Sequence, residues 1–146
     1  MGLFDFLKKK PVEVIQPQQP SYTVLVVDDE LYLREFYQDL LTRQGYNVIT
    51  ATNGQEALDI VAKTPPHVIL LDIMMPVMDG VEVMRTLWKN NLTNRIPVIV
   101  LTNAGDMDHM DKAKYYSTYQ FFIKSNVQPE EIIEAVNQAI SLSQPE

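Results

Sequence analysis

The chain has 146 residues, of which 46% are hydrophobic and 21% are charged, and its formal net charge is −7 with a pI near 4.8. These values are typical of a soluble globular protein with one domain. The acidic balance argues against binding nucleic acid through the domain as a whole. With no cysteine the chain has no disulfide or thiolate metal site, and two histidines are too few for an all-imidazole zinc site.

The first 20 residues differ in composition from the rest. Residues 11–20 (PVEVIQPQQP) are rich in proline and glutamine and predict an extended linker. Residues 1–10 contain a short apolar stretch followed by three lysines. This segment is expected to be either a docking peptide or weak membrane contact, or a frayed tail. No apolar run approaches the ~18 residues that span a bilayer, and the N-terminus does not have the order of a secretory signal. We therefore expect a cytoplasmic protein without an integral membrane segment, folded over residues 21–146.

From Tyr22 onward, apolar runs of strand length alternate with helical patterns. The runs are Val24–Val27, Val48–Ala51, Val68–Leu71, Val98–Leu101 and Tyr119–Ile123. The helical patterns lie at 33–41, 57–61, 83–88, 107–116 and 132–140. This alternation predicts an α/β fold, with a parallel five-stranded sheet covered on both faces by right-handed crossovers.

Three residues are expected to mark helix ends. Gly45 follows the first helical pattern as a stop signal. Asn53 is suited to cap the second helix. Pro129, followed by two glutamates, is suited to begin the last helix.

The candidate site residues follow the apolar runs, because ligands of such sheets bind beyond the carboxyl ends of the strands. They are Asp28 and Asp29 after the first run, Asp72 after the third, Thr102 after the fourth and Lys124 after the fifth. Each alone is compatible with a solvated loop, a cap or an ordinary exposed residue. Three carboxylates, a hydroxyl and an ammonium at one sheet edge together predict a site.

The chemistry of this set indicates phosphoryl transfer. Clustered carboxylates raise one another's pKa unless a cation stabilises their ionised forms. Mg²⁺ suits oxygen ligands of this kind, whereas the lack of thiolates and of a nearby histidine pair disfavours Zn²⁺. An aspartate beside Mg²⁺ and a lysine is suited to attack a phosphoryl group.

Four stretches, VLVVDDE, VILLDIMMPVMDG, IPVIVLTNAG and FFIKS, resemble the receiver domain of bacterial two-component response regulators. The resemblance covers about residues 22–143, and the stretch that contains Pro76, Asp79 and Gly80 is highly specific. It implies a flavodoxin-like (βα)5 three-layer sandwich with sheet order 2-1-3-4-5, as in the chemotaxis receiver. Residues 21–146 would then be the receiver domain, preceded by the tail and linker of residues 1–20.

The resemblance implies that Asp72 is the phosphoacceptor, supplied by a sensor histidine kinase or a histidine phosphotransfer protein. Asp28, Asp29, Asp72 and the backbone carbonyl of Met74 would hold Mg²⁺. Lys124 would pair with the phosphoryl oxygens.

A switch is implied as well. Thr102 would donate its hydroxyl to the phosphoryl group while the ring of Phe121 moves inward. The face formed by the fourth helix, the fifth strand and the last helix would change, and a downstream target protein would bind there.

The sequence departs from the family pattern at several positions. Ser125 replaces the proline that usually follows the lysine with a cis bond, and because a cis bond without proline costs ~2.5–4 kcal/mol we expect a trans bond. Phe121 replaces a common tyrosine, and Asn103 is expected to narrow access to Asp72. Neither Met74 nor Ala104 can activate a water molecule, so we expect slow self-dephosphorylation.

No output domain follows the last helical pattern, so we expect a stand-alone receiver, monomeric or weakly dimeric, that binds protein rather than nucleic acid. It would catalyse only its own phosphorylation and dephosphorylation. The alternatives are a phosphorelay intermediate that passes the phosphoryl group to a histidine, or a non-phosphorylated scaffold domain. A Mg²⁺-dependent phosphohydrolase would need a general acid or base that the strand ends do not offer.

Three tyrosines lie near the fourth helical pattern and are expected either at an interface or in packing of the fourth helix: Tyr115, Tyr116 and Tyr119.

Overall fold

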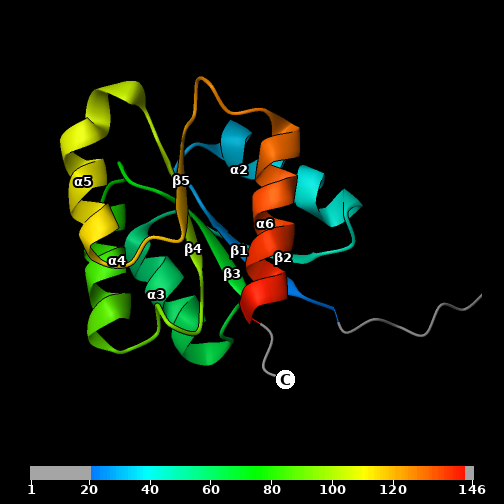
Figure 1. Cartoon of the computed structure of the whole chain (residues 1–146), viewed down its shortest axis with the longest axis horizontal. Helices are drawn as coiled ribbons and strands as arrows, with labels where there is room; N and C mark the ends of the chain where they lie inside the picture. Colours follow the sequence, from blue (N-terminus) through cyan, green and yellow to red (C-terminus); the bar gives the residue numbers. More distant parts are fainter. Residues whose placement is uncertain (1–20, 144–146) are drawn as a thin grey trace, which may run out of the picture.

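Residues 21–143 are described by a computed structural model in which a five-stranded sheet lies between two layers of helices (Figure 1). The strands are β1 (Thr23–Val27), β2 (Asn47–Ala51), β3 (Val68–Asp72), β4 (Val98–Thr102) and β5 (Gln120–Ile123). The helices are α2 (Leu31–Arg43), α3 (Gly54–Lys63), α4 (Gly80–Lys89), α5 (Met107–Tyr115) and α6 (Pro129–Ser143), with a 3₁₀ turn, η1, at Ala104–Asp106. The predictions for residues 1–20 lie outside the described residues.

All neighbouring strands are parallel, and the order is β2-β1-β3-β4-β5, as the resemblance implied. Val27 at the end of β1 pairs with Leu71 of β3. Thr102 at the end of β4 pairs with Ile123 of β5. The residues at the carboxyl ends of these four strands therefore reach one edge of the sheet.

Both faces of the three central strands, β1, β3 and β4, are buried. Figure 1 shows α2 and α6 on one face and α3, α4 and α5 on the other. Leu25 and Ile69 belong to the core under α3, α4 and α5, whereas Val24 and Leu70 belong to the core under α2 and α6. Burial on both faces explains why the strands are continuous apolar runs rather than alternating ones. Each fully buried aliphatic side chain contributes roughly 1.5–3 kcal/mol.

The predicted helix ends are confirmed. The Asn53 side chain accepts a hydrogen bond from the backbone N–H of Glu56, 2.9 Å away, at the start of α3. Gly45 follows α2 with φ +92°, a left-handed conformation that glycine adopts without a Cβ penalty. Pro129 is the first residue of α6.

The structure differs from the sequence expectation in a few details. Strands β3 and β4 each run one residue further than predicted, so Asp72 and Thr102 end their strands rather than follow them. The apolar side of α2 is only partly covered, because Tyr37 and Leu41 are buried while Phe36 is 40% exposed. Within residues 21–143, no helix has the length and apolar character needed to cross a membrane.

Candidate metal and phosphoryl-acceptor site

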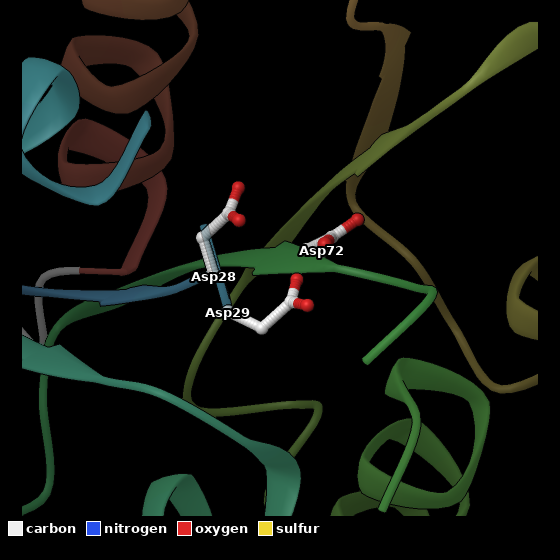
Figure 2. A group of neighbouring side chains, drawn as sticks. All are labelled: Asp28, Asp29 and Asp72. Atoms are coloured by element: carbon white, nitrogen blue, oxygen red, sulfur yellow. The ribbon is translucent and has the colours of Figure 1, made fainter. Parts of the chain in front are cut away.

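The three predicted acidic residues meet at the carboxyl ends of β1 and β3 (Figure 2). Asp28 and Asp29 directly follow β1, and Asp72 ends β3, the strand beside it. One carboxylate oxygen from each lies within 4.8 Å of the other two. Asp28 and Asp72 are buried, and Asp29 is exposed at the mouth of the group.

Lys124 joins this group from the end of β5. Its ammonium nitrogen Nζ lies 3.0 Å from Oδ2 of Asp28 and 3.2 Å from Oδ1 of Asp72. The Lys124 side chain is 8% exposed, so both ion pairs lie in an environment that screens charge much less than bulk water does. The predicted ammonium is therefore in direct contact with two of the three predicted carboxylates, those of Asp28 and Asp72.

Asp28 is held by further hydrogen bonds. Its Oδ1 accepts from the backbone N–H of Glu30 at 2.9 Å, and its own N–H donates to the carbonyl of Ala51 at 3.1 Å. Arg34 of α2 donates from Nη1 to the Asp28 carbonyl at 2.8 Å. Arg34 was not among the predicted site residues, because its helical position relative to the end of β1 is not visible in the sequence.

The pKa of Asp72 is raised to about 7. Burial is the main cause, because it disfavours the charged carboxylate, and the negative charges of Asp28 and Asp29 act in the same direction. The positive charge of Lys124 opposes them. For Lys124, burial lowers the pKa, but Asp72 and Asp28 more than offset this, so that the pKa is raised and the side chain is cationic.

The residues fit a hard divalent cation. Three carboxylates converge on one point at the sheet edge, and two of them are buried with a single ammonium between them. An oxygen-only donor set of this kind suits Mg²⁺ and is poor for zinc. Met74, whose carbonyl was expected to complete the set, lies two residues beyond Asp72 in the loop that leads to α4.

Thr102 and Phe121, the predicted switch pair, lie on adjacent strands. Thr102 is fully buried, and its hydroxyl donates to the carbonyl of Asn103 at 3.3 Å. Phe121 is 37% exposed on β5. The ammonium of Lys114 lies 3.9 Å from the centroid of the Phe121 ring. The hydroxyl is thus bonded to the main chain, and the ring is in contact with solvent and a cation.

The loop after Lys124 has a trans Lys124–Ser125 bond, as expected, since residues 21–143 contain no cis peptide bond. The N–H of Lys124 donates to the Thr102 carbonyl at 2.8 Å, which continues the β4–β5 ladder up to the site. The N–H of Asn126 then donates to the Ile123 carbonyl at 2.9 Å and closes a turn. The ladder thereby fixes the backbone of Lys124 relative to Thr102.

Gly80, the last residue of the stretch VILLDIMMPVMDG, allows a close approach between α4 and β3. A Cβ at this position would lie 2.5 Å from the Asp72 carbonyl oxygen and 2.8 Å from Cα of Ile73. Its N–H donates to the Ile73 carbonyl at 2.7 Å. Only glycine permits α4 to begin this close to the backbone of Asp72.

Tyr37, predicted only as a core residue, also borders the site. It is 4% exposed and lines, with Lys124 and Phe36, a hollow of about 220 Å³ between α2 and the loop before α6. Burial raises the pKa of its hydroxyl, Lys124 lowers it, and Asp28 and Asp72 raise it further. The Tyr37 hydroxyl therefore interacts electrostatically with Lys124, Asp28 and Asp72.

The three tyrosines near the end of α5, Tyr115, Tyr116 and Tyr119, have different environments. Tyr119 packs against the core under α2 and α6, and Tyr116 packs against the core under α3, α4 and α5. Tyr115 is 73% exposed, with its ring 6.1 Å from that of Trp88. Packing of the fourth helix, α5, therefore holds for Tyr116 alone, Tyr119 packs on the opposite face of the sheet, and Tyr115 remains a candidate for contact with a partner.

Comparison with known proteins identifies relatives of this chain. The family model described as the response regulator receiver domain matches residues 24–137. Sporulation initiation phosphotransferase F of Bacillus subtilis is 34% identical over 101 residues, which cover 69% of this chain and 80% of that protein. The probable transcriptional regulator ycf29 of Pyropia yezoensis is 34% identical over 121 residues, which cover 83% of this chain and 54% of that longer protein.

A solved structure shows the same architecture. The receiver domain of the Francisella response regulator 1452 has a TM-score of 0.77 and 26% identity, and the match covers 85% of this chain and 100% of that one. The fold and the strand-end site thus define a receiver domain of two-component signalling. The chain belongs to the response regulator receiver family. Members of this family are signalling domains that bind Mg²⁺ through acidic residues.

Proposed function

We propose that residues 21–146 act as a stand-alone receiver that accepts a phosphoryl group on Asp72 from a sensor histidine kinase or a histidine phosphotransfer protein. The observation that carries this proposal is the contact of Lys124 with both buried carboxylates, Asp28 and Asp72. The stand-alone part is supported by the similarity to sporulation initiation phosphotransferase F, of which the match covers 80%. The cytoplasmic location and the monomeric or weakly dimeric state stay predictions.

The transfer step uses groups already in place. An ionised carboxylate oxygen of Asp72 attacks the phosphorus, the bond from phosphorus to the donor's imidazole nitrogen breaks, and the electron pair returns to that nitrogen. Lys124 lies where its ammonium can stabilise charge on the transferred phosphoryl oxygens. Asp28, Asp29, Asp72 and the Met74 carbonyl would hold Mg²⁺, which when bound supplies further positive charge.

The signal would then pass through Thr102. In the present structure its hydroxyl is bonded to the Asn103 carbonyl. A phosphoryl group on Asp72 offers a charged acceptor, which forms a stronger hydrogen bond than a neutral carbonyl does. Movement of Thr102 toward it allows the Phe121 ring to move inward, which changes the face formed by α5, β5 and α6 for a downstream target protein.

A phosphorelay intermediate is the second candidate. It is favoured by the similarity to a protein named a phosphotransferase. In this case the acyl phosphate of Asp72 would be attacked by a histidine of a second partner. Incubation of the ³²P-labelled protein with a purified histidine phosphotransfer protein distinguishes the two: loss of label to histidine favours the relay, and retention favours the terminal receiver.

Two other functions are less well supported. A non-phosphorylated scaffold would not need Lys124 in contact with both Asp28 and Asp72. A phosphohydrolase would need a general acid or base beside Asp72. His67 instead accepts a hydrogen bond from the N–H of Thr23 at the amino end of β1, and His109 lines a hollow between α4 and α5.

The proposal is tested by titrating the ¹⁵N-labelled chain with beryllofluoride, a phosphoryl mimic, in the presence of Mg²⁺. We expect resonance changes at the strand ends and on the α5-β5-α6 face, and none in the Asp72→Asn variant. The exposed Asp39→Asn serves as the matched control and should respond like the wild type. Changes that persist in Asp72→Asn would refute Asp72 as the acceptor.

A further inference from the structure

The ring of Phe121 is covered on its outer side by a cation. Lys114 of α5 places its ammonium 3.9 Å from the ring centroid. Phe121 itself is 37% exposed on the edge strand β5. A cation over an aromatic face is attracted by the ring quadrupole, so the contact favours the outward ring position.

The position of Lys114 is fixed by the end of its helix. The Lys114 carbonyl accepts from the N–H of Ser117 at 3.2 Å. The hydroxyl of Thr118 donates to the carbonyl of Ala113 at 2.9 Å, and Ala113 is buried. The last turn of α5 is thereby joined to the turn that leads into β5, and Lys114 and Phe121 are held on opposite sides of one short connection.

Phe121 and Thr102 lie on the same face of the sheet. Phe121 pairs with Val100 in the parallel ladder, and Thr102 is two residues beyond Val100. Because side chains alternate along a strand, Val100 and Thr102 point to the same face. Val100 belongs to the core under α3, α4 and α5, the helix layer that also carries Lys114.

We propose that Lys114 is a positioning residue that holds the Phe121 ring outward and so opposes the activated arrangement of the site. This inference rests on the proposed function of Asp72 and Thr102. Phosphorylation has to displace the ring from the ammonium before Thr102 and Phe121 can move together. Lys114 thereby sets part of the free-energy difference between the two states, although it touches neither Asp72 nor the phosphoryl group.

Lys114 has a second role that the test must separate. With Lys112 it places positive charge in the last turn of α5, which stabilises that end of the helix. Lys112 lines the hollow between α4 and α5 and lies in the same turn. Lys112→Met is therefore a matched control, because it removes one of the two positive charges at this helix end, as Lys114→Met does, and keeps the cation over Phe121.

The experiment measures the affinity of the full chain for beryllofluoride at saturating Mg²⁺. Lys114→Met is expected to bind about two- to five-fold more tightly than the wild type, because the outward state loses an exposed cation–π contact. Lys114→Arg keeps a cation and should remain close to the wild type, as should Lys112→Met. Equal affinities for Lys114→Met and the wild type, or an equal gain in Lys112→Met, would overturn the proposal.

A second measurement does not depend on phosphoryl chemistry. In a double-mutant cycle, thermal unfolding of Lys114→Met is compared in the wild-type and Phe121→Leu backgrounds. We expect a smaller loss in the Phe121→Leu background, and additive losses would overturn the contact. If the wild type fails to bind the mimic while the cycle shows coupling, the function proposed for Asp72 fails and the Lys114 contact stands without a regulatory role.

Discussion

The ammonium nitrogen of Lys124 lies 3.2 Å from Oδ1 of Asp72, and the same nitrogen lies 3.0 Å from Oδ2 of Asp28. One cation therefore compensates two buried carboxylates from two strands. The arrangement leaves the site poorly neutralised, and Asp29 adds a third negative charge at its mouth. The site is thus suited to bind a further cation. Lys124 lies close enough to Asp72 to contact the oxygens of a phosphoryl group bound there.

Replacing this lysine should weaken both the fold and the site. In Lys124→Met the ionised buried carboxylates lose their partner, and we expect a loss of about 3–5 kcal/mol in unfolding free energy at pH 8, above the raised pKa of Asp72. The loss should shrink at low pH, where the carboxylates are protonated, and on addition of Mg²⁺. Urea unfolding at several pH values measures it, with the exposed Lys63→Met as control. A loss that is the same at all pH values would contradict the ion-pair explanation.

The raised pKa of Asp72 predicts a pH-dependent effect of Asp72→Asn. The folded protein holds a proton on this carboxyl up to a pH of about 7, against a usual value of 3.8. The contribution of Asp72 to the free energy of unfolding is therefore fully present below a pH of 3.8 and is lost as the pH rises through the raised pKa of about 7.

In Mg²⁺-free buffer, Asp72→Asn should melt close to the wild type at pH 5 and above it at pH 8, because asparagine has no charge to bury. Added Mg²⁺ should narrow the difference at pH 8, since the ion favours the ionised carboxylate. Differential scanning fluorimetry over this pH range checks both expectations. A difference that stays constant with pH, or that is largest at pH 5, would contradict the assigned pKa.

Gly80 should tolerate no side chain. In Gly80→Ala the new Cβ meets the backbone of Asp72 and Ile73 at 2.5 and 2.8 Å, so the backbone must move. We expect a loss of about 1–3 kcal/mol in unfolding free energy and weaker binding of beryllofluoride. Gly105→Ala is the control, because nothing lies within 4 Å of its added Cβ. Equal behaviour of the two variants would show that α4 can shift without disturbing Asp72.

The phosphorylated form should be long-lived. Met74 and Ala104 offer no group that can act as a general base or orient an attacking water molecule. Met74→Glu places a carboxylate in the loop after Asp72 and should shorten the lifetime of the phosphorylated form. Loss of the phosphoryl adduct over time, followed by intact mass, measures the rate. A half-life of seconds in the wild type would contradict this expectation.

Much of the fold could be predicted from local patterns. The buried strands are unbroken apolar runs because both sheet faces are covered, and Asn53, Gly45 and Pro129 mark helix ends by their own backbone chemistry. Because the carboxyl ends of parallel strands lie at one edge of the sheet, the sequence alone predicted that Asp28, Asp72 and Lys124 lie close together.

Other contacts could not be predicted, because they depend on how helices lie against the sheet. Arg34 reaches the Asp28 carbonyl only through the packing of α2. The contact of Lys114 with Phe121 depends on the turn after α5. The exposure of Phe36, placed by its spacing on the apolar side of α2, depends on the hollow beside the loop before α6. Periodicity gives the side of a helix, but not what covers it.

The central claim is that Asp72 accepts a phosphoryl group. Its most direct test is the intact mass of the protein after incubation with Mg²⁺ and acetyl phosphate, for the wild type and for Asp72→Ala. We predict one phosphoryl adduct on the wild type, absent without Mg²⁺ and absent in the variant. A wild type that stays unmodified, or an adduct that persists in Asp72→Ala, would contradict it.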